Sequence, residues 1–118
     1  MRITVTLPLP PNMANKSWGH WGRKARARND YMLLALVTSQ GVVRPHRPWP
    51  RARIKATLYT WNPMDYDNAI ARLKWCVDFL VERGLILSDT DKVLEWEKPE
   101  QHVDRKHPRV EIELTEVS

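Results

Sequence analysis

Three segments of the chain alternate apolar and polar side chains with the two-residue period of a β-strand, and this pattern limits the possible folds more than any other feature. The segments are residues 2–7, 51–61 and 108–117. Each is expected to bury one face and to expose the other. Because such strands need a layer packed against their apolar face, the pattern predicts a sheet with other elements on one side of it.

Two segments between these strands favour helices. Residues 24–40 and 68–83 are each followed by a glycine, Gly41 or Gly84, which readily adopts the left-handed conformation found after a helix. The residues of the first helix expected to face the core are Ala27, Tyr31, Leu34, Ala35 and Thr38. Those of the second, which fall within about a third of its circumference, are Ile70, Leu73, Val77, Leu80 and Val81.

The second predicted helix also has apolar side chains, Trp75 and Phe79, on the side opposite its core stripe. This arrangement predicts that the helix is covered twice, by the sheet and by one further element. The first helix and a second subunit are both candidates for that cover.

The remaining segments are a strand at residues 92–98 and polar loops at residues 12–22 and 99–108. The order of elements is then strand, helix, strand, helix, strand and strand. It predicts an α/β or α+β fold, with one mixed sheet of about four strands and two helices packed on it. A length of 118 residues without an internal repeat fits a single domain over residues 1–118.

The cysteine content and the hydropathy indicate a reducing compartment. Cys76 is the only cysteine and no apolar run reaches about 18 residues, so a disulfide framework, a membrane span and a signal peptide are not expected. We therefore expect a cytoplasmic protein. Cys76 lies inside the second predicted helix, where a buried thiol is expected rather than a nucleophile.

Charge is distributed unevenly along the chain. Residues 1–55 carry a formal charge of +10 and residues 56–118 carry −5. The basic half is expected to attract a polyanion, whereas the acidic half gathers carboxylates that a polyanion repels unless metal ions intervene. An ordinary surface of mixed sign is the alternative. The strand at residues 51–61 directs Arg51 and Arg53 outward, to contact phosphates or to form a solvated sheet face.

The sequence DYDN at residues 65–68 stands just before the second predicted helix. On an extended backbone Asp65 and Asp67 project to the same side, so both carboxylates can reach one cation. Mg²⁺ suits such a site because it binds a few carboxylate oxygens and keeps waters that a phosphate oxygen can replace. The alternative is structural: Asp67 or Asn68 caps the helix, and Asp65 is solvated.

Asp89 and Asp91, in the turn after the second helix, can complete this site if folding returns the turn to the DYDN sequence. A metal ion there would polarise a phosphate and acidify the attacking water. Lys74, two helical turns after Asp67, would stabilise the charge that develops on the phosphate. The alternative role of Lys74 is an ion pair with Asp78, which contributes only a few tenths of a kcal/mol.

Four stretches follow one another in the order LPLPPNMANKSW, DYDN, LKWCVDFL and RGLILSDTDKV, and the strand VEIELTE closes the chain. They resemble the patterns LPxPPSxN[RK], DxDN, KxxxDxL and AGhhxDDxxV, with h apolar, of the RusA-type Holliday junction resolvases of bacteria, prophages and phages. These are crossover junction endodeoxyribonucleases. The similarity spans nearly the whole chain.

The resemblance implies a homodimeric endonuclease, dependent on Mg²⁺ or alternatively Mn²⁺, that resolves four-way DNA junctions by paired symmetric nicks during recombination and repair. The residues that correspond to its catalytic groups are Asp65, Asp67, Asp89 and Lys74, and the three acids bind the metal. Asp91 is a second candidate for the third acid, because Ser88 stands where the family has the first acid of its DD turn.

Basic and aromatic residues around this site are expected to contact DNA. The candidates are Asn15, Lys16, Trp18, Arg23, Lys24, Arg51, Arg53 and Lys55. Trp18 and Trp21 either stack on unpaired bases or pack their loop onto the domain. Neither a membrane nor a nucleotide cofactor is expected. Two other functions remain open: a branched-DNA-binding module without catalysis on the same scaffold, and a structural protein whose acids only cap and solubilise.

Overall fold

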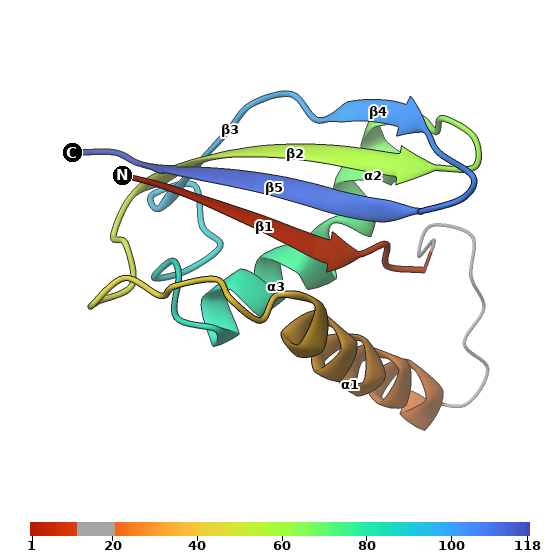
Figure 1. The fold of residues 1–118 in the computed structure, drawn as a ribbon, viewed down its shortest axis with the longest axis horizontal. Helices are drawn as coiled ribbons and strands as arrows, with labels where there is room; N and C mark the ends of the chain where they lie inside the picture. Colours follow the sequence, from red (N-terminus) through yellow and green to blue (C-terminus); the bar gives the residue numbers. More distant parts are fainter. Residues whose placement is uncertain (12–20) are drawn as a thin grey trace.

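The structure, a computed structural model, describes residues 1–11 and 21–118 but not the side chain of Trp21 (Figure 1). Its elements are β1 (Arg2–Pro8), α1 (Trp21–Thr38), β2 (Ala52–Thr60), α2 (Tyr66–Arg72), α3 (Lys74–Glu82), β3 (Leu94–Trp96), β4 (Glu100–Val103) and β5 (Arg109–Glu116). They form an α+β fold with one mixed sheet of five strands, so the predicted fold class is confirmed.

The sheet is built around two long strands, β2 and β5. β5 lies between β1 and β2 and is antiparallel to both, whereas β3 and β4 each pair in parallel with a part of β2. The apolar residues that face each other across β2 and β5, all of them buried, are Ile54 with Leu114, Ala56 with Ile112 and Leu58 with Val110. The period-two pattern therefore builds one continuous apolar face.

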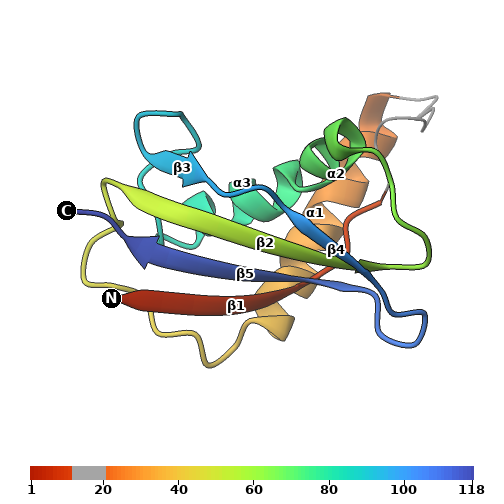
Figure 2. The same ribbon diagram turned by 90° about the horizontal axis from the view of Figure 1, so that it is seen from above.

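Helices α1 and α3 lie on one side of the sheet, and no helix of residues 1–11 and 21–118 covers the other side (Figure 1 and Figure 2). Buried residues of the strands, α1 and α3 form one apolar cluster. In the part of the chain that the structure describes, no helix has the length and apolar character needed to cross a membrane.

The second predicted helix consists of α2 and α3, which meet at Leu73. Leu73 is fully buried, and its N–H donates to the carbonyl oxygens of both Ala69 (3.2 Å) and Ile70 (3.1 Å). The helix therefore tightens at this residue while its backbone hydrogen bonds continue into α3 through Val77.

The side of α3 that carries Trp75 and Phe79 is covered by α1. Both side chains are buried, and the Tyr31 ring of α1 lies 5.8 Å from the Trp75 ring at an interplanar angle of 46°. Of the two predicted covers, the first helix is the one found. The predicted core face of α1 is correct at Tyr31 and Ala35 but wrong at Leu34, which is 52% exposed, and at Thr38, which is also exposed.

Residues 99–108, predicted as a polar loop, contain β4, a strand that the sequence did not predict. β4 pairs with the end of β2, from Thr57 opposite Glu100 to Thr60 opposite Val103. The sequence EQHV has no apolar alternation because its side chains are at least partly exposed. The strand is held by backbone pairing with the edge of β2 that β3 leaves free, which a hydropathy pattern does not reveal.

Candidate functional site

Asp65 occupies the N-cap position of α2, with φ −59° and ψ 152°, but its carboxylate makes no capping hydrogen bond. Its carbonyl oxygen accepts the first helical hydrogen bond from Ala69 N–H at 2.9 Å. The predicted cap at Asp67 or Asn68 is therefore wrong. The Asp65 carboxylate is exposed and makes no hydrogen bond to the helix. It is therefore accessible to a ligand.

Asp67 lies in the first turn of α2 and is exposed. The prediction that Asp65 and Asp67 share an extended backbone is wrong, because α2 begins between them at Tyr66. The two carboxylates leave the chain from different backbone conformations, so a spacing of two residues does not by itself place them on one side.

Asp67 borders a hollow of about 370 Å³ that is also lined, among the described residues, by Tyr66, Ile70 and Trp96. Ile70 and Trp96 also line a second hollow of about 250 Å³, which contains Lys74 and Asp89. The two hollows adjoin, and we call them together the α2–β3 groove. The groove therefore brings Asp67, Lys74 and Asp89 to one side of the α2–α3 helix, although they come from three separate stretches of the sequence.

Asp65 and Asp91 do not line the groove. Among the described residues, no three side chains of the His, Cys, Asp or Glu type form a group that could hold a metal ion. The chemical type of the donors fits Mg²⁺, which commonly binds one or two carboxylates and takes the rest of its ligands from water and substrate phosphate. The predicted set of four acids is thus not gathered into a single cluster.

The turn that carries Asp89 is held by its two neighbours. The Ser88 hydroxyl oxygen accepts a hydrogen bond from Thr90 N–H at 3.2 Å and lies 2.9 Å from the Thr90 hydroxyl. Ser88 therefore stabilises the turn in the position where the resembled family has an acid. Asp89 itself is exposed.

Lys74 lies on the surface at the start of α3, with 65% of its side chain exposed. Its Nζ is 3.6 Å from Asp78 Oδ1, which is the ion pair expected as the alternative role of Lys74. Asp78 also pairs with Arg28 of α1 at 3.5 Å. Lys74 is therefore held near the groove by a carboxylate that has a second cationic partner.

The chain just before Asp65 is clamped by β4. The Gln101 side chain accepts a hydrogen bond from Met64 N–H (2.7 Å) and donates one to the Met64 carbonyl (2.8 Å). This pair of bonds imitates the pairing of two strands and fixes the backbone one residue before the N-cap of α2. Gln101 was not identified from the sequence, because the polar loop predicted there gave it no partner.

Two aromatic residues of the groove, Tyr66 and Trp96, were also missed by the sequence analysis. They are 48% and 36% exposed, and Lys98 Nζ lies 5.9 Å from the centre of the Tyr66 ring. Exposed aromatic rings near a lysine are the kind of groups on which bases stack in proteins that bind single-stranded nucleic acid. The available signal was that each of these aromatic residues stands between two acidic residues in the sequence, as DYD and EWE.

The basic residues predicted on β2 are paired with acids of the neighbouring strands. Arg51 and Arg53 lie 3.3 and 3.6 Å from Glu95 of β3, and Lys55 lies 3.3 Å from Glu100 of β4. The hydrogen bond with Glu100 raises the pKa of Lys55. This face is therefore of mixed charge, as the alternative interpretation expected, and its cations would have to exchange carboxylates for phosphates to bind DNA.

Arg23 and Lys24 lie in the first turns of α1 and are exposed. Asn15, Lys16 and Trp18 lie outside the described residues, as does the side chain of Trp21. The chain that leads to them is anchored beside α2, because Arg72 donates a hydrogen bond of 2.6 Å to the Pro10 carbonyl.

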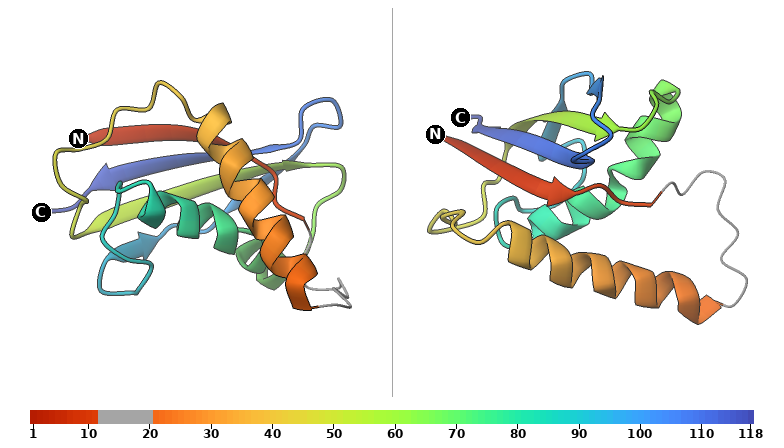
Figure 3. Two further views of the ribbon diagram at one scale, coloured as in Figure 1. Left: turned by 90° about the horizontal axis from the view of Figure 1, so that it is seen from below. Right: turned by 45° about the vertical axis from the view of Figure 1, so that its right-hand side comes forward.

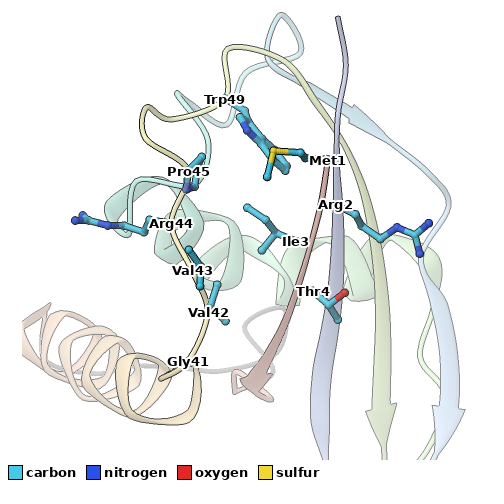
Figure 4. Close-up of a pocket in the computed structure, with 10 residues that line it drawn as sticks. All are labelled: Met1, Arg2, Ile3, Thr4, Gly41, Val42, Val43, Arg44, Pro45 and Trp49. Atoms are coloured by element: carbon cyan, nitrogen blue, oxygen red, sulfur yellow. The ribbon is translucent and has the colours of Figure 1, made fainter.

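A further hollow, of about 310 Å³, lies between the start of β1 and the chain after α1 (Figure 4). Met1, Ile3, Val43 and Trp49 are among its lining residues. β1 and β2 run in the same direction, because both are antiparallel to β5. Since this hollow is at the start of β1 and Asp65 follows the end of β2, the hollow is at the opposite end of the sheet from Asp65.

The sequence matches no known protein-family model, and no curated protein matches it either.

Proposed function

We propose that this chain is a Mg²⁺-dependent endonuclease of the RusA type that nicks four-way DNA junctions at the α2–β3 groove. The observation that supports the proposal most is the lining of the groove by Asp67, Lys74 and Asp89. These three residues correspond to motifs of the resembled family that are separate in the sequence. The proposed setting is DNA recombination and repair in the cytoplasm of a bacterial or phage-infected cell.

Asp67 and Asp89, which line the groove, would hold the Mg²⁺. The resemblance adds Asp65 as a further ligand, with Asp91 as the alternative to Asp89, and both Asp65 and Asp91 would have to reach the ion from outside the groove. When bound, the ion would supply a polarised phosphate and a more acidic water. Lys74 would stabilise the negative charge that grows on the phosphate oxygens, since an exposed ammonium at the edge of the groove can approach them.

Tyr66 and Trp96 would stack on unpaired bases at the junction, and Lys98 would contact a neighbouring phosphate. Arg23 and Lys24 would extend the phosphate contacts along α1. Paired symmetric nicks need two such sites, so the proposal includes a homodimer with two-fold symmetry.

The test is cleavage of a synthetic mobile four-way junction in the presence of Mg²⁺, with a linear duplex as the control substrate. Wild type should give paired symmetric nicks in the junction alone. Asp67→Asn should abolish them and still bind the junction. Glu97→Gln is a matched control, because Glu97 is an exposed carboxylate outside the groove. Equal nicking by wild type and Asp67→Asn would contradict the proposal.

A second candidate is a branched-DNA-binding module without catalysis. It is favoured by the absence of an assembled three-acid group among the described residues. This candidate predicts tight, salt-dependent binding of the junction by both wild type and Asp67→Asn, without nicks under Mg²⁺ or Mn²⁺.

A further inference from the structure

β1 is an edge strand of the sheet, because among the described residues it pairs with β5 alone. Glu116 N–H donates to the Met1 carbonyl oxygen at 2.9 Å, in line with the register of the two strands. In an antiparallel pair every second residue bonds to the partner strand. The backbone N–H and C=O groups of Arg2, Thr4 and Thr6 therefore point away from β5, along the free edge of β1.

The far end of this edge is already closed. Pro8 belongs to the same outward-facing set, and its carbonyl oxygen accepts a hydrogen bond of 2.8 Å from the Tyr31 hydroxyl. Within residues 1–11 and 21–118, the outward backbone groups of Arg2, Thr4 and Thr6 have no such partner. An edge strand with unpaired backbone groups is a template on which a further strand can pair.

An apolar hollow adjoins the free edge. The chain that follows α1 passes on the side of β1 away from β5 (Figure 2 and left panel of Figure 3). Residues 41–45 and the start of β1 border about 310 Å³ of space, whose apolar lining includes Ile3, Val42, Val43 and Trp49 (Figure 4). Val43 is 82% exposed and is available to a further apolar group. A side chain carried by an added strand would fill this hollow.

Helix α1 extends the apolar surface beside the edge. Arg28 pairs with Asp78 of α3, so that flank of α1 faces α3. Tyr31, which reaches the outer edge of β1, lies about 60° further round the helix, and Leu34 lies about 60° beyond Tyr31 in the same direction. Leu34 is therefore beyond the edge, and it is 52% exposed. A strand added to β1 would cover Leu34, which the apolar stripe of α1 predicted to be buried.

The backbone groups of the edge favour a peptide over a nucleic acid. Each outward residue offers one N–H donor and one C=O acceptor. A phosphodiester oxygen only accepts hydrogen bonds, so a nucleic acid backbone would leave the outward carbonyl oxygens without partners. A peptide in an extended conformation supplies donors and acceptors at the spacing of the edge, which is the basis of recognition by strand addition.

The charge at the hollow favours an acidic peptide. Arg2 and Arg44 are its charged lining residues in the described part of the chain, and both are exposed. The contact of Arg2 with Glu113 is long, at 3.8 Å, and a surface ion pair of this kind is weak enough to be exchanged for another. A second copy of β1, with the sequence RITVTLP, would bring another arginine and no acid.

We propose that the free edge of β1 binds an extended acidic segment of a partner protein, which adds to the sheet as an antiparallel strand. Ile3 and Arg2 point to opposite sides of β1 (Figure 4). The peptide residue opposite Ile3 would place an apolar side chain in the hollow, and the residue opposite Arg2 would place a carboxylate beside its guanidinium. The next residue, opposite Met1, lies on the side where Arg44 lines the hollow, so a second acid suits that position.

The probe is a fluorescein-labelled, C-terminally amidated peptide, Thr-Val-Thr-Leu-Asp-Asp, titrated with the full chain and followed by fluorescence anisotropy. In the proposed register its leucine is opposite Ile3, its first aspartate is opposite Arg2, and its second threonine is opposite Thr4. Wild type should bind it saturably, and a peptide with lysine in place of both aspartates should not bind.

Two N-methylated forms of the peptide test the backbone pairing with an unaltered protein. In the antiparallel pair the N–H of the second threonine bonds to Thr4, whereas the N–H of the leucine points away from β1. Methylating the threonine nitrogen should weaken binding about 10-fold or more, because it removes a donor and leaves the Thr4 carbonyl oxygen unpaired. Methylating the leucine nitrogen should change binding little.

Three protein variants test the same site, with circular dichroism melts as the check on folding. Thr4→Pro removes an outward N–H that β5 does not use, and should abolish binding while the protein stays folded. Arg2→Glu should bind the lysine peptide in preference to the aspartate peptide. Val43→Glu should repel the aspartate peptide, whereas its matched control Val103→Glu, at a 53% exposed position on β4, should bind as wild type does.

Absence of saturable binding by wild type would overturn the inference, as would equal binding of the two N-methylated peptides. Light scattering after size exclusion, with and without the peptide, tests the other occupant: a dimer that the peptide converts to a peptide-bound monomer would assign the edge to a second copy instead. The inference does not depend on the proposed reaction, because the hollow is at the opposite end of the sheet from Asp65. A chain that binds the peptide and cuts no DNA would leave it intact.

Discussion

Lys74 and Asp78 lie one turn apart on α3, with the Lys74 ammonium 3.6 Å from a carboxylate oxygen of Asp78. An ion pair between residues four apart on a helix contributes little stability, about 0.3–0.5 kcal/mol. Asp78 has a second partner in Arg28 at 3.5 Å and does not depend on Lys74 for compensation of its charge. Lys74 contributes little to the stability of the fold and lies at the edge of the groove. Replacing it therefore tests whether it has a catalytic role or only a structural one.

Lys74→Ala should reduce junction nicking by about 100-fold, a loss typical of removing one group that stabilises transition-state charge. Binding of the junction and the melting temperature should change little. Asp78→Asn is the control: it breaks the ion pair with Lys74, and also that with Arg28, and should keep most of the nicking activity. Equal effects of the two substitutions on nicking would assign Lys74 to the ion pair alone. The measurement is single-turnover cleavage at saturating enzyme.

Gln101→Ala should act on Asp65 through the backbone of Met64. Losing two hydrogen bonds to a partly buried backbone should cost about 1–3 kcal/mol in the free energy of unfolding, measured with urea. It should also raise the Mg²⁺ concentration needed for half-maximal nicking, because the segment before Asp65 is no longer fixed. Gln101→Glu keeps the acceptor for Met64 N–H but turns a carboxylate oxygen toward the Met64 carbonyl oxygen, so it should lower stability at least as much as Gln101→Ala.

A merely structural Gln101 would lower stability without moving the Mg²⁺ dependence. Comparing the two readouts at a temperature where every variant is fully folded distinguishes these roles. An unchanged Mg²⁺ midpoint in Gln101→Ala would remove Gln101 from the site as a positioning residue.

Trp96→Ala should weaken binding of a four-way junction by about 10-fold or more, because stacking of one base on an aromatic ring contributes about 1–3 kcal/mol. Trp96→Phe should retain much of the affinity. Trp61→Ala is the control, since Trp61 is 60% exposed and lies outside the groove, with Arg105 5.9 Å from its ring centre. Equal losses for Trp61→Ala and Trp96→Ala, measured by fluorescence anisotropy, would argue against a stacking site in the groove.

Local patterns predicted most of the fold, because the period of the strands and the glycines after the helices are properties of short segments. β4 was missed because its pairing with β2 depends on backbone contacts across some forty residues of sequence. The break at Leu73 was missed for a similar reason, since leucine favours helix and only tertiary packing makes its position special.

The sequence supplied a set of candidate site residues but not their arrangement in space. The resemblance of the motifs indicated Asp67, Lys74 and Asp89 as candidates, and these three residues line the groove. Spacing did not reveal that a helix begins between Asp65 and Asp67. It also could not identify Trp96 or Gln101, because their roles depend on which distant segment each one meets.

Burial of Cys76 should make the stability of the protein fall in alkaline solution. Cys76 is fully buried, and its burial raises the pKa of the thiol to about 12 from the ordinary 9.0, while Tyr31, whose hydroxyl lies 3.2 Å from the sulfur, also has a raised pKa. The folded state therefore keeps protons that the unfolded state loses. Stability should be full below pH 9 and should decline as the pH rises from about 9 toward 12.

Unfolding in urea at pH 7 and pH 10 measures this effect, which should be about 1–2 kcal/mol for wild type. Cys76→Ala should be less stable at pH 7, because it removes buried volume, and should lose less stability between the two pH values. In wild type at pH 8 a thiol reagent should react with Cys76 only after unfolding, since a buried, protonated thiol is a poor nucleophile. Rapid labelling of the native protein would show that Tyr31 and the surrounding core do not shield the thiol as the structure describes.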